Sequence, residues 1–376
     1  MTTYKRLGDY IRPVDVRNRD LKVNLSQGIC NAKYFQNPKQ VADNPETHKV
    51  VRTGQFAYNR ATTRNGEKIS IALREGPDCT VSSAYQVFEI VDEKLLHPKY
   101  LMMWFKRPEF DRLAIFYSHG SAHEFFEWDA MCDVLLPIPS IERQREIVSE
   151  YETLTNRIHL NEQMIQHLEA TAQTLYRKMF VDNIDKENLP EGWRIGTIGE
   201  FCKEMKSGGT PSRNHNEYWD KKDYPWLKSG EVHNNIIISI EEFISKAGLN
   251  SSSAKIIPQG SVIMAMYGAT AAQVAYLSCD TTTNQACCNM ICHSKEDAAY
   301  LFFHLLANQE DIKKLANGGA QENLSQEIIA QQPILLLNDK ETKSLFVPIL
   351  DNLIVLYKEN AKLTELQSLL LAKMGQ

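Results

Sequence analysis

Two stretches of the sequence place apolar or small side chains at alternating steps of three and four residues, the 3.5-residue period of a coiled coil. The first runs from Ser140 to Phe180 and carries the stripe Tyr151, Leu154, Ile158, Asn161, Ile165, Leu168, Ala172, Leu175 and Met179. The second carries Phe346, Ile349, Leu353, Leu356, Asn360, Leu363, Gln367, Leu370 and Met374. Two helices of about 35–40 residues, roughly 50–60 Å long, are therefore expected.

The ends of these helices also have local signals. Ser140 follows Pro139 and has the side chain of a good N-cap, and Asn338 with Glu341 three residues later resembles a capping box. Pro348 fits either the first turns of the second helix or a kink in it.

A heptad stripe can also pack into an ordinary core, but two stripes, each after a globular half, favour pairing with each other. Asn161 and Asn360 lie within the stripes and would set the register of the pair. If the two halves are related by a pseudo-twofold axis, the helices must run antiparallel. The residues expected to pair are Tyr151, Leu154, Ile158, Asn161, Ile165, Leu168, Leu353, Leu356, Asn360, Leu363 and Leu370.

The sequence contains an internal repeat. The segment Gly120–Glu124 (GSAHE) reappears 198 residues later as Gly318–Glu322 (GGAQE). Leu7–Tyr10 similarly resembles Ile198–Phe201, and Tyr100-Leu101 resembles Tyr300-Leu301. An ordered series of matches across both halves predicts two copies of one unit, each a globular part followed by a long helix.

Each globular part is expected to be mixed α/β. Short apolar or β-branched stretches bounded by turn residues predict strands at 54–59, 69–73, 82–91, 195–201, 236–240, 260–266, 273–277 and 286–292. Helices are expected at 98–116 and 295–316. The predicted domains are 1–139 and 193–337, with helices at 140–180 and 338–376 and a polar linker at 181–192.

Composition narrows the function classes. The 376 residues carry 42 Lys+Arg and 47 Asp+Glu, a net charge of −5, which argues against a chain that coats DNA indiscriminately. That average combines +6 over residues 1–117 with −7 over 118–188, which suggests different partners for neighbouring segments. No apolar run is long enough to span a membrane, and eight cysteines are too few for a disulfide scaffold. A cytoplasmic location is expected.

Signals for catalysis and metal binding are weak. Phosphate-binding glycine loops and the Asn/Asp-Pro-Pro-aromatic motif of amino-methyltransferases are absent from the sequence. Pro77-Asp78 with Asp92–Lys94 matches a nuclease pattern, but Asp-x-Lys recurs at several other places. The cysteines at 279–292 lack the paired spacing of zinc knuckles, so free thiols are expected there. We predict no catalytic residue and no metal ligand in this chain.

Binding signals are stronger, because basic, amide and aromatic side chains gather in short polar segments. Arginine pairs with guanine, asparagine and glutamine pair with adenine, and lysine mostly contacts phosphate. The candidates for DNA contact are Arg52, Gln55, Tyr58, Asn59, Arg60, Arg64, Asn65, Lys68, Lys206, Ser207, Thr210, Ser212, Arg213, Lys228, Ser229, Glu231, Tyr267, Thr270, Asn284 and Gln285.

The chain resembles the specificity subunits of Type I restriction–modification enzymes along nearly its whole length. The residues that carry the resemblance are Leu189–Trp193, Ser207–Pro211, Trp226–Glu231, Ala265–Thr270 and Thr283–Cys288, with Arg52–Arg64 and Leu136–Pro139 in the first half. One departure is Leu335–Leu337, which stands where the first copy has Pro137–Pro139.

The resemblance implies two target-recognition domains and two paired helices, which together read an asymmetric, two-part DNA site. It also implies partners: two methyltransferase subunits that use S-adenosylmethionine, and motor-endonuclease subunits that use ATP and Mg²⁺. This chain itself would bind no cofactor. Two alternatives stay open, a coiled-coil scaffold that binds only proteins and a reader for a methyltransferase system without a nuclease.

Overall fold

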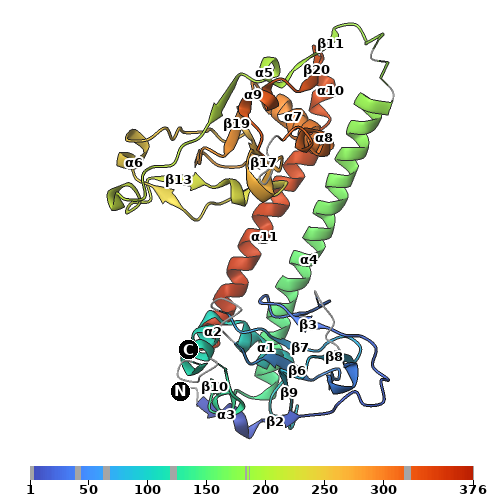
Figure 1. Ribbon diagram of the computed structural model, residues 1–376, viewed down its shortest axis with the longest axis vertical. Coiled ribbons are helices and arrows are strands. Elements are labelled where there is room, and N and C mark those ends of the chain that lie inside the picture. The colour runs from blue at the N-terminus through green and yellow to red at the C-terminus, as the bar shows by residue number, and fades with distance from the viewer. Residues whose placement is uncertain are drawn as a thin grey trace. The chain divides into compact units, whose positions relative to one another are not determined.

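The computed structural model describes residues 4–38, 44–61, 68–118, 125–182, 184–185, 187–316 and 323–375. The chain divides into two units: Met1–Arg157 with Leu363–Gln376 forms unit 1, and Ile158–Lys362 forms unit 2. Each unit is a mixed α/β fold that includes part of both long helices (Figure 1).

The two long helices are present, and the second begins later than predicted. Helix α4 covers Ile141–Arg177 and ends in a π-helical turn, η3 (Lys178–Asp182). Ser140 accepts a hydrogen bond from the Arg143 N–H at 3.3 Å, which is the expected N-cap contact.

The predicted capping box at Asn338 was wrong. Asp339, one residue further on, caps the short helix α10 (Lys340–Ser344) by accepting from the N–H groups of Glu341 and Thr342. Helix α11 (Val347–Lys373) follows after a break, and Pro348 is its second residue. Proline is tolerated there because the first N–H groups of a helix have no intrahelical partner.

Unit 2 is built on a five-stranded sheet in the order β12–β19–β16–β17–β14, in which only the β14–β17 pair is parallel. A three-stranded sheet, β15–β13–β18, and the pair β11–β20 complete its strands. The strands are β11 (Trp193–Thr197), β12 (Glu204–Ser207), β13 (Tyr224–Leu227), β14 (Asn235–Ile237), β15 (Phe243–Ile244), β16 (Val262–Ala265), β17 (Val274–Leu277), β18 (Thr282–Thr283), β19 (Cys287–Ile291) and β20 (Pro333–Leu337). The helices are α5 (Ile198–Phe201), α6 (Lys246–Asn250), α7 (Lys295–Ala307), α8 (Gln309–Lys313) and α9 (Gln326–Ala330).

Strand β16 shows why the sheet of unit 2 is apolar on both faces. Val262 and Met264 belong to one core cluster, while Ile263 and Ala265 belong to another, and all four are fully buried. Since successive side chains of a strand point to opposite faces, the run VIMA places two residues in each layer. The larger cluster includes Tyr176 of α4, Phe180 of η3 and Phe346 just before α11.

Unit 1 repeats this plan with a four-stranded antiparallel sheet, β2–β9–β6–β7. The pairs β1–β10, β3–β4 and β5–β8 lie outside it. The strands are β1 (Tyr4–Arg6), β2 (Ile11–Val14), β3 (Gly28–Ile29), β4 (Phe35–Gln36), β5 (Lys49–Val51), β6 (Phe56–Asn59), β7 (Ile71–Leu73), β8 (Cys79–Val81), β9 (Tyr85–Ile90) and β10 (Leu135–Pro137). The helices are α1 (Pro98–Lys106), α2 (Pro108–Ser118) and α3 (Trp128–Cys132).

Backbone contacts confirm that the two units are copies of one fold. Phe126 donates its N–H to the Arg60 carbonyl at 2.8 Å, and Leu324 donates to the Met266 carbonyl at the same distance. Strand β20, which contains Leu335–Leu337, pairs with β11 as β10 pairs with β1. The departure from the proline-rich pattern therefore leaves that strand in place. The matched segments 120–124 and 318–322 lie outside the described residues.

Some predicted elements needed correction. The strand expected at 195–201 ends at Thr197, because the Thr197 side chain caps helix α5 by accepting from the Glu200 N–H. The helix expected at 98–116 is two helices, since Pro108 cannot continue α1. The helix expected at 295–316 is likewise divided at Asn308, which lies between α7 and α8.

Candidate nucleic-acid interface

In unit 2, four loops that are distant in the sequence meet at one end of the five-stranded sheet. They follow β12, β13 and β16 or precede β19, and they hold most of the candidate residues of the second half. Gly209 donates its N–H to the Thr283 carbonyl at 2.8 Å, and Asn284 donates to the Leu227 carbonyl at 3.0 Å. The Thr270 hydroxyl donates to the Ser229 carbonyl at 3.1 Å. These bonds tie the four loops into one surface.

Gly208 allows the first of these loops to pass close to the last. A Cβ atom at Gly208 would lie 2.2 Å from the Thr283 carbonyl oxygen, a distance at which any side chain would clash with the backbone. The Ser207 hydroxyl just before it donates to the Gln326 side chain at 2.8 Å. Close backbone packing therefore positions the polar residues that follow, from Thr210 to Arg213.

Two cations of this surface share one carboxylate. Glu242 forms ion pairs with Arg213 and with Lys228, the latter at 3.1 Å between Nζ and Oε2. The Arg213 guanidinium also lies 3.5 Å above the ring centroid of Trp219 and 5.1 Å from that of Trp226. The Arg213 hydrogen bond is the main cause that lowers the pKa of Glu242, with Lys228 adding to it. Glu242 thus stays ionised and holds both cations at the surface.

The remaining candidates of unit 2 are arranged around this group. Thr210 donates to the Gln285 amide oxygen at 2.5 Å, and both residues are exposed. Glu231 accepts a hydrogen bond from the Lys228 N–H at 2.9 Å, so its side chain stabilises the loop after β13. Lys206 is paired with Glu204 at 2.8 Å. The exposed or half-exposed candidates that remain are Ser212, Ser229, Tyr267, Thr270 and Asn284.

In unit 1, strand β6 separates the candidates into two groups. Arg52 and Gln55 precede the strand, whereas Asn59 and Arg60 lie at its carboxyl end, about 13 Å further along. Lys68 precedes β7, the antiparallel neighbour, and so lies at the same end as Arg60. Arg64 and Asn65 lie outside the described residues. The end with Arg60 corresponds to the end of unit 2 where Tyr267 follows β16.

Arg60 is half-buried and already has two contacts. Its guanidinium lies 3.3 Å from a Glu127 carboxylate oxygen and 5.4 Å from the ring centroid of Phe125. As with Arg213, an aromatic ring and a carboxylate hold an arginine in a segment that follows a strand. Arg52, at the opposite end, is exposed.

Two candidates belong to the fold and not to the surface. Tyr58 has no exposed surface and packs with Phe56 in the core, so it cannot contact DNA. Because successive side chains of a strand point to opposite faces, Tyr58 lies on the same face of β6 as the core residue Phe56. Gln55 is buried. It accepts a hydrogen bond from the Arg52 N–H at 2.8 Å and donates one to Glu89 at 2.8 Å, so it stabilises the turn that precedes β6.

The helical stripes meet through a pair of asparagines. In unit 2, the Asn161 amide of α4 donates to the Asn360 amide oxygen of α11 at 2.8 Å, and Tyr176 approaches Phe346 at 6.4 Å between ring centroids. Residue 161 is thus paired with residue 360, and residue 176 lies near residue 346. The later position on one helix meets the earlier position on the other, so the helices run antiparallel. In unit 1, Gln367 donates to the Thr155 hydroxyl at 2.7 Å in the same sense. Every stripe position of both helices is buried or half-buried.

Sequence reasoning missed several residues of this surface. Glu242 lies in an ordinary polar turn before β15, and nothing in its neighbourhood marks it as the partner of two cations 14 and 29 residues away. Trp219 carries no motif and becomes relevant only because Arg213 stacks on it. These contacts depend on the packing of separate loops.

Two structural expectations concern the rest of the chain. The eight cysteines are free thiols, including the four at 279–292 for which free thiols were expected. The described residues contain no group of His, Cys, Asp and Glu side chains able to hold a metal ion. Among the described residues, no helix is both long enough and apolar enough to cross a membrane.

Comparisons with known proteins relate the chain to one family. A family model described as the Type I restriction modification DNA specificity domain matches residues 190–368. The specificity subunit of the Type I restriction enzyme HindI from Haemophilus influenzae is 23% identical, over 92% of this chain and 91% of that protein. The EcoR124I/EcoR124II specificity subunit from Escherichia coli is 26% identical, over 44% of this chain and 41% of its own.

A solved structure supports the same fold. The S subunit of a Type I restriction–modification system from M. genitalium aligns with 100% of this chain and 96% of its own, with a TM-score of 0.60 and 13% sequence identity. Residues 190–368 thus match the Type I restriction modification DNA specificity domain, and the chain as a whole is similar in sequence and in fold to specificity subunits of Type I restriction systems.

Proposed function

We propose that this chain is the DNA-reading subunit of a Type I restriction–modification complex and that each unit reads one half of an asymmetric, two-part site. The observation that carries the proposal is the four-loop surface of unit 2, where Arg213 and Lys228 lie beside exposed amide and hydroxyl side chains. Cations contact phosphate and fix the position of a protein on DNA, whereas amide side chains distinguish bases.

The candidate residues divide accordingly. Lys228 and Arg213 suit phosphate contacts because Glu242 holds them at the surface without burying them. Gln285 and Asn284 suit base contacts through their amide N–H groups, since their amide oxygens already accept from the Thr210 hydroxyl and the Ala286 N–H. In unit 1 the corresponding surface is the carboxyl end of β6, with Arg60 and Lys68 as its described cations.

The paired helices would set the distance between the two half-sites and bind the partner subunits. The Asn161–Asn360 hydrogen bond supports a single register, since a polar pair in an apolar seam disfavours sliding. Leu160, Met164 and Val355 expose about half of their surface or more, at 55%, 53% and 60%. Exposed apolar side chains on these helices are suited to a protein partner.

The chemistry would belong to the partners. In this proposal two methyltransferase subunits use S-adenosylmethionine to modify adenine, and motor-endonuclease subunits use ATP and Mg²⁺. This chain contributes recognition and no catalytic residue.

Co-expression with a methyltransferase subunit encoded nearby, followed by genome-wide mapping of methyladenine, tests the proposal. A two-part methylated motif that appears only when this chain is present is the expected result. Methylation without any motif that depends on this chain would favour a protein-binding scaffold and contradict DNA reading. A motif without cleavage of unmodified DNA, when all encoded partners are present, would identify a methyltransferase-only system.

A further inference from the structure

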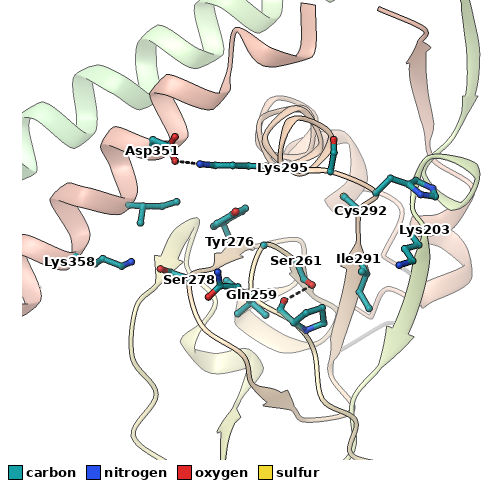
Figure 2. Close-up of a pocket in the computed structure, with 16 residues that line it drawn as sticks. Lys203, Gln259, Ser261, Tyr276, Ser278, Ile291, Cys292, Lys295, Asp351 and Lys358 are labelled. Atoms are coloured by element: carbon teal, nitrogen blue, oxygen red, sulfur yellow. Dashed lines mark hydrogen bonds and ion pairs between the residues drawn. The ribbon is translucent and has the colours of Figure 1, made fainter. Parts of the chain in front are cut away.

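The charged side chains that line a pocket in unit 2 do not converge on one point. This pocket has a volume of about 610 Å³, and Figure 2 shows Lys203 and Lys358 on opposite sides of it. The third lysine of the lining, Lys295, is neutralised by Asp351 at 2.5 Å. In unit 1, by contrast, charged and polar groups converge at the turn between β3 and β4.

The turn between β3 and β4, residues 30–34, lies at the carboxyl end of β6. A backbone N–H of β3 donates to the Tyr85 hydroxyl at 3.4 Å, and Tyr85 pairs with Asn59, the last residue of β6. The Ser70 hydroxyl donates to the Asn31 side-chain oxygen at 2.9 Å, and the Ser70 carbonyl accepts from the Asn59 N–H at the same distance. These bonds fix the turn beside Asn59, a candidate for DNA contact.

A buried lysine attaches the turn to helix α2. Lys33 is only 7% exposed, and its ammonium group lies 2.7 Å from Asp111 and donates to the Phe105 carbonyl at 2.5 Å. The same Asp111 oxygen accepts from the Ile69 N–H at 3.1 Å, so one carboxylate joins the turn to the residues before β7. Lys33 also has a left-handed backbone, with φ at 67°. A buried ammonium group and a left-handed backbone are both unfavourable for lysine, and such features concentrate at functional sites.

The surface at this turn carries an uncompensated positive charge. Residues 21–38 contain no Asp or Glu. Lys68 is exposed and forms no ion pair with any described residue. Burial is the main cause that lowers the pKa of Lys33, and the charge of Lys68 lowers it further, so the two ammonium groups are neighbours. Because Lys33 neutralises Asp111, the charge of Lys68 remains available to a ligand.

An aromatic side chain is exposed on the same turn. Tyr34 exposes 56% of its surface, and its hydroxyl shares a hydrogen bond with the Cys30 thiol, which limits the positions of the ring. Tyrosine offers a rigid, amphipathic contact surface at a low cost in conformational entropy, and its hydroxyl is among the groups that contact phosphate and sugar in DNA. An exposed ring beside an unpaired lysine, on a segment without carboxylates, suits nucleic acid.

We propose that the turn between β3 and β4 is a further DNA contact of unit 1, in which Tyr34 contacts the sugar–phosphate backbone beside a phosphate bound by Lys68. Lys33 is the residue that positions this turn. The inference rests on the proposed function and adds to it a contact segment outside the candidate residues identified from the sequence. Since backbone contacts carry no base information, the turn would fix the orientation of unit 1 on its half-site.

Photocrosslinking in the complex with the methyltransferase subunit tests the proposal. Photoreactive benzoylphenylalanine in place of Tyr34 should crosslink to a duplex that carries the methylated two-part motif. The same amino acid in place of Val91 is the matched control, because Val91 has a similar exposure, 54%, and follows β9 at the opposite end of the sheet. No crosslink to DNA is expected from that position.

Affinity for the same duplex provides an energetic test. Tyr34→Ala should weaken binding several-fold without changing the salt slope, whereas Lys68→Ala should lower that slope by about one. Lys33→Gln should weaken binding about as much as Tyr34→Ala does. Because Lys33 acts through the turn, the double variant should lose no more affinity than Tyr34→Ala alone.

Several outcomes would overturn the proposal. A crosslink from position 34 only to the methyltransferase subunit would make the turn a protein-binding surface. Equal affinity of Tyr34→Ala and the parent for the motif would contradict the turn alone, whereas a parent complex without any preferred duplex would contradict the proposed function as well. Additive losses from Lys33→Gln and Tyr34→Ala would contradict the positioning role of Lys33. Should Lys33→Gln fail to fold, as judged by its melting temperature, the substitutions of Tyr34 still decide the question.

Discussion

At the scale of single residues, Glu242 has the most influence on the surface proposed to contact DNA. It is a carboxylate in a region where phosphate would bind, and it holds Arg213 and Lys228 in place through ion pairs. A DNA phosphate would have to compete with Glu242 for the same two cations. Phosphate contacts do not depend on sequence, so this competition weakens binding to every DNA sequence equally. Base contacts then account for a larger part of the affinity for the specific site.

We predict that Glu242→Gln raises affinity for any duplex several-fold at low salt and lowers discrimination between a specific and an unrelated site. The substitution removes one negative charge, and the gain should shrink as salt screens it. Lys228→Ala should have the opposite effect, weaker binding to all sequences and a salt slope smaller by about one. Fluorescence anisotropy of the complex with its methyltransferase partner, across a salt series, measures both.

Glu241→Gln is the control, because Glu241 is the exposed neighbour and forms no ion pair with any described residue. An equal gain from Glu241→Gln would show that net charge alone matters. Weaker binding by Glu242→Gln would mean that the carboxylate mainly positions the cations.

His304 carries a second residue-scale prediction, on stability. It is buried in α7, and its Nδ1 lies 2.6 Å from the Tyr176 hydroxyl of α4. Burial lowers its pKa to about 4, whereas an unfolded histidine takes up a proton near pH 6.5. Below that pH the unfolded chain binds the proton and the folded chain does not. The contribution of neutral His304 is therefore fully present above about pH 6.5 and is lost as the pH falls toward 4.

His304→Gln should flatten this dependence, because an amide can still bond to Tyr176 but does not titrate in this range. The expected difference in slope amounts to about 2–3 kcal/mol between pH 7 and pH 4. Urea denaturation midpoints at several pH values measure it. Parallel pH profiles for the two proteins would show that His304 contributes nothing to acid sensitivity.

At the scale of elements, the long helices depend on one polar contact within an apolar seam. Asn161 is fully buried and donates to Asn360, while Ile158 and Ile165 on either side of it belong to the apolar stripe. An amide in such a position costs stability but disfavours every register in which it would face a leucine.

We predict that Asn161→Leu destabilises the chain by about 1–3 kcal/mol, because the Asn360 amide oxygen loses its donor. The double variant Asn161→Leu/Asn360→Leu should recover that loss or exceed the parent in stability, since both polar groups are removed together. A double-mutant cycle in melting temperature measures the coupling. Additive effects of the two substitutions would contradict a paired role.

At the scale of the whole molecule, the repeated unit and the antiparallel helices suit a two-part DNA site. Two modest recognition surfaces on one chain bind at high effective concentration once the first is engaged. The two units carry different side chains at corresponding positions, such as Arg60 in one and Met266 in the other. The two half-sites should therefore differ in sequence.

Removing one heptad from each helix, residues 154–160 and 361–367, should shorten the preferred spacer between the half-sites. Seven residues correspond to about 10 Å of helix, or roughly three base pairs. Deleting these two segments leaves the Asn161–Asn360 pair in place and keeps the 3.5-residue period of both stripes. Methyladenine mapping of the variant complex reads the spacer directly. An unchanged spacer in an active complex would refute a measuring role for the helices.

Local patterns predicted the parts of this chain that depend on neighbouring residues. The heptad stripes, the Ser140 cap and the repeated order of elements all follow from spacings of a few residues, and the contact between Asn161 and Asn360 lies within those stripes. Predictions failed where two local signals competed. At Asn338 and Asp339, either side chain could cap a helix, and only the path of the chain after β20 selects Asp339.

The sequence alone thus determined that the chain has two copies of one mixed α/β unit joined to two long pairing helices, because helical period and repeat order are encoded locally. Tertiary structure decided which polar residues share a surface. Ser207, Tyr267 and Asn284 come together because β12, β16 and β19 pair in a particular register, whereas in unit 1 the length of strand β6 separates Arg52 from Arg60. Strand pairing joins residues that are distant in the sequence, and it is set by how both faces of the sheet bury their apolar side chains.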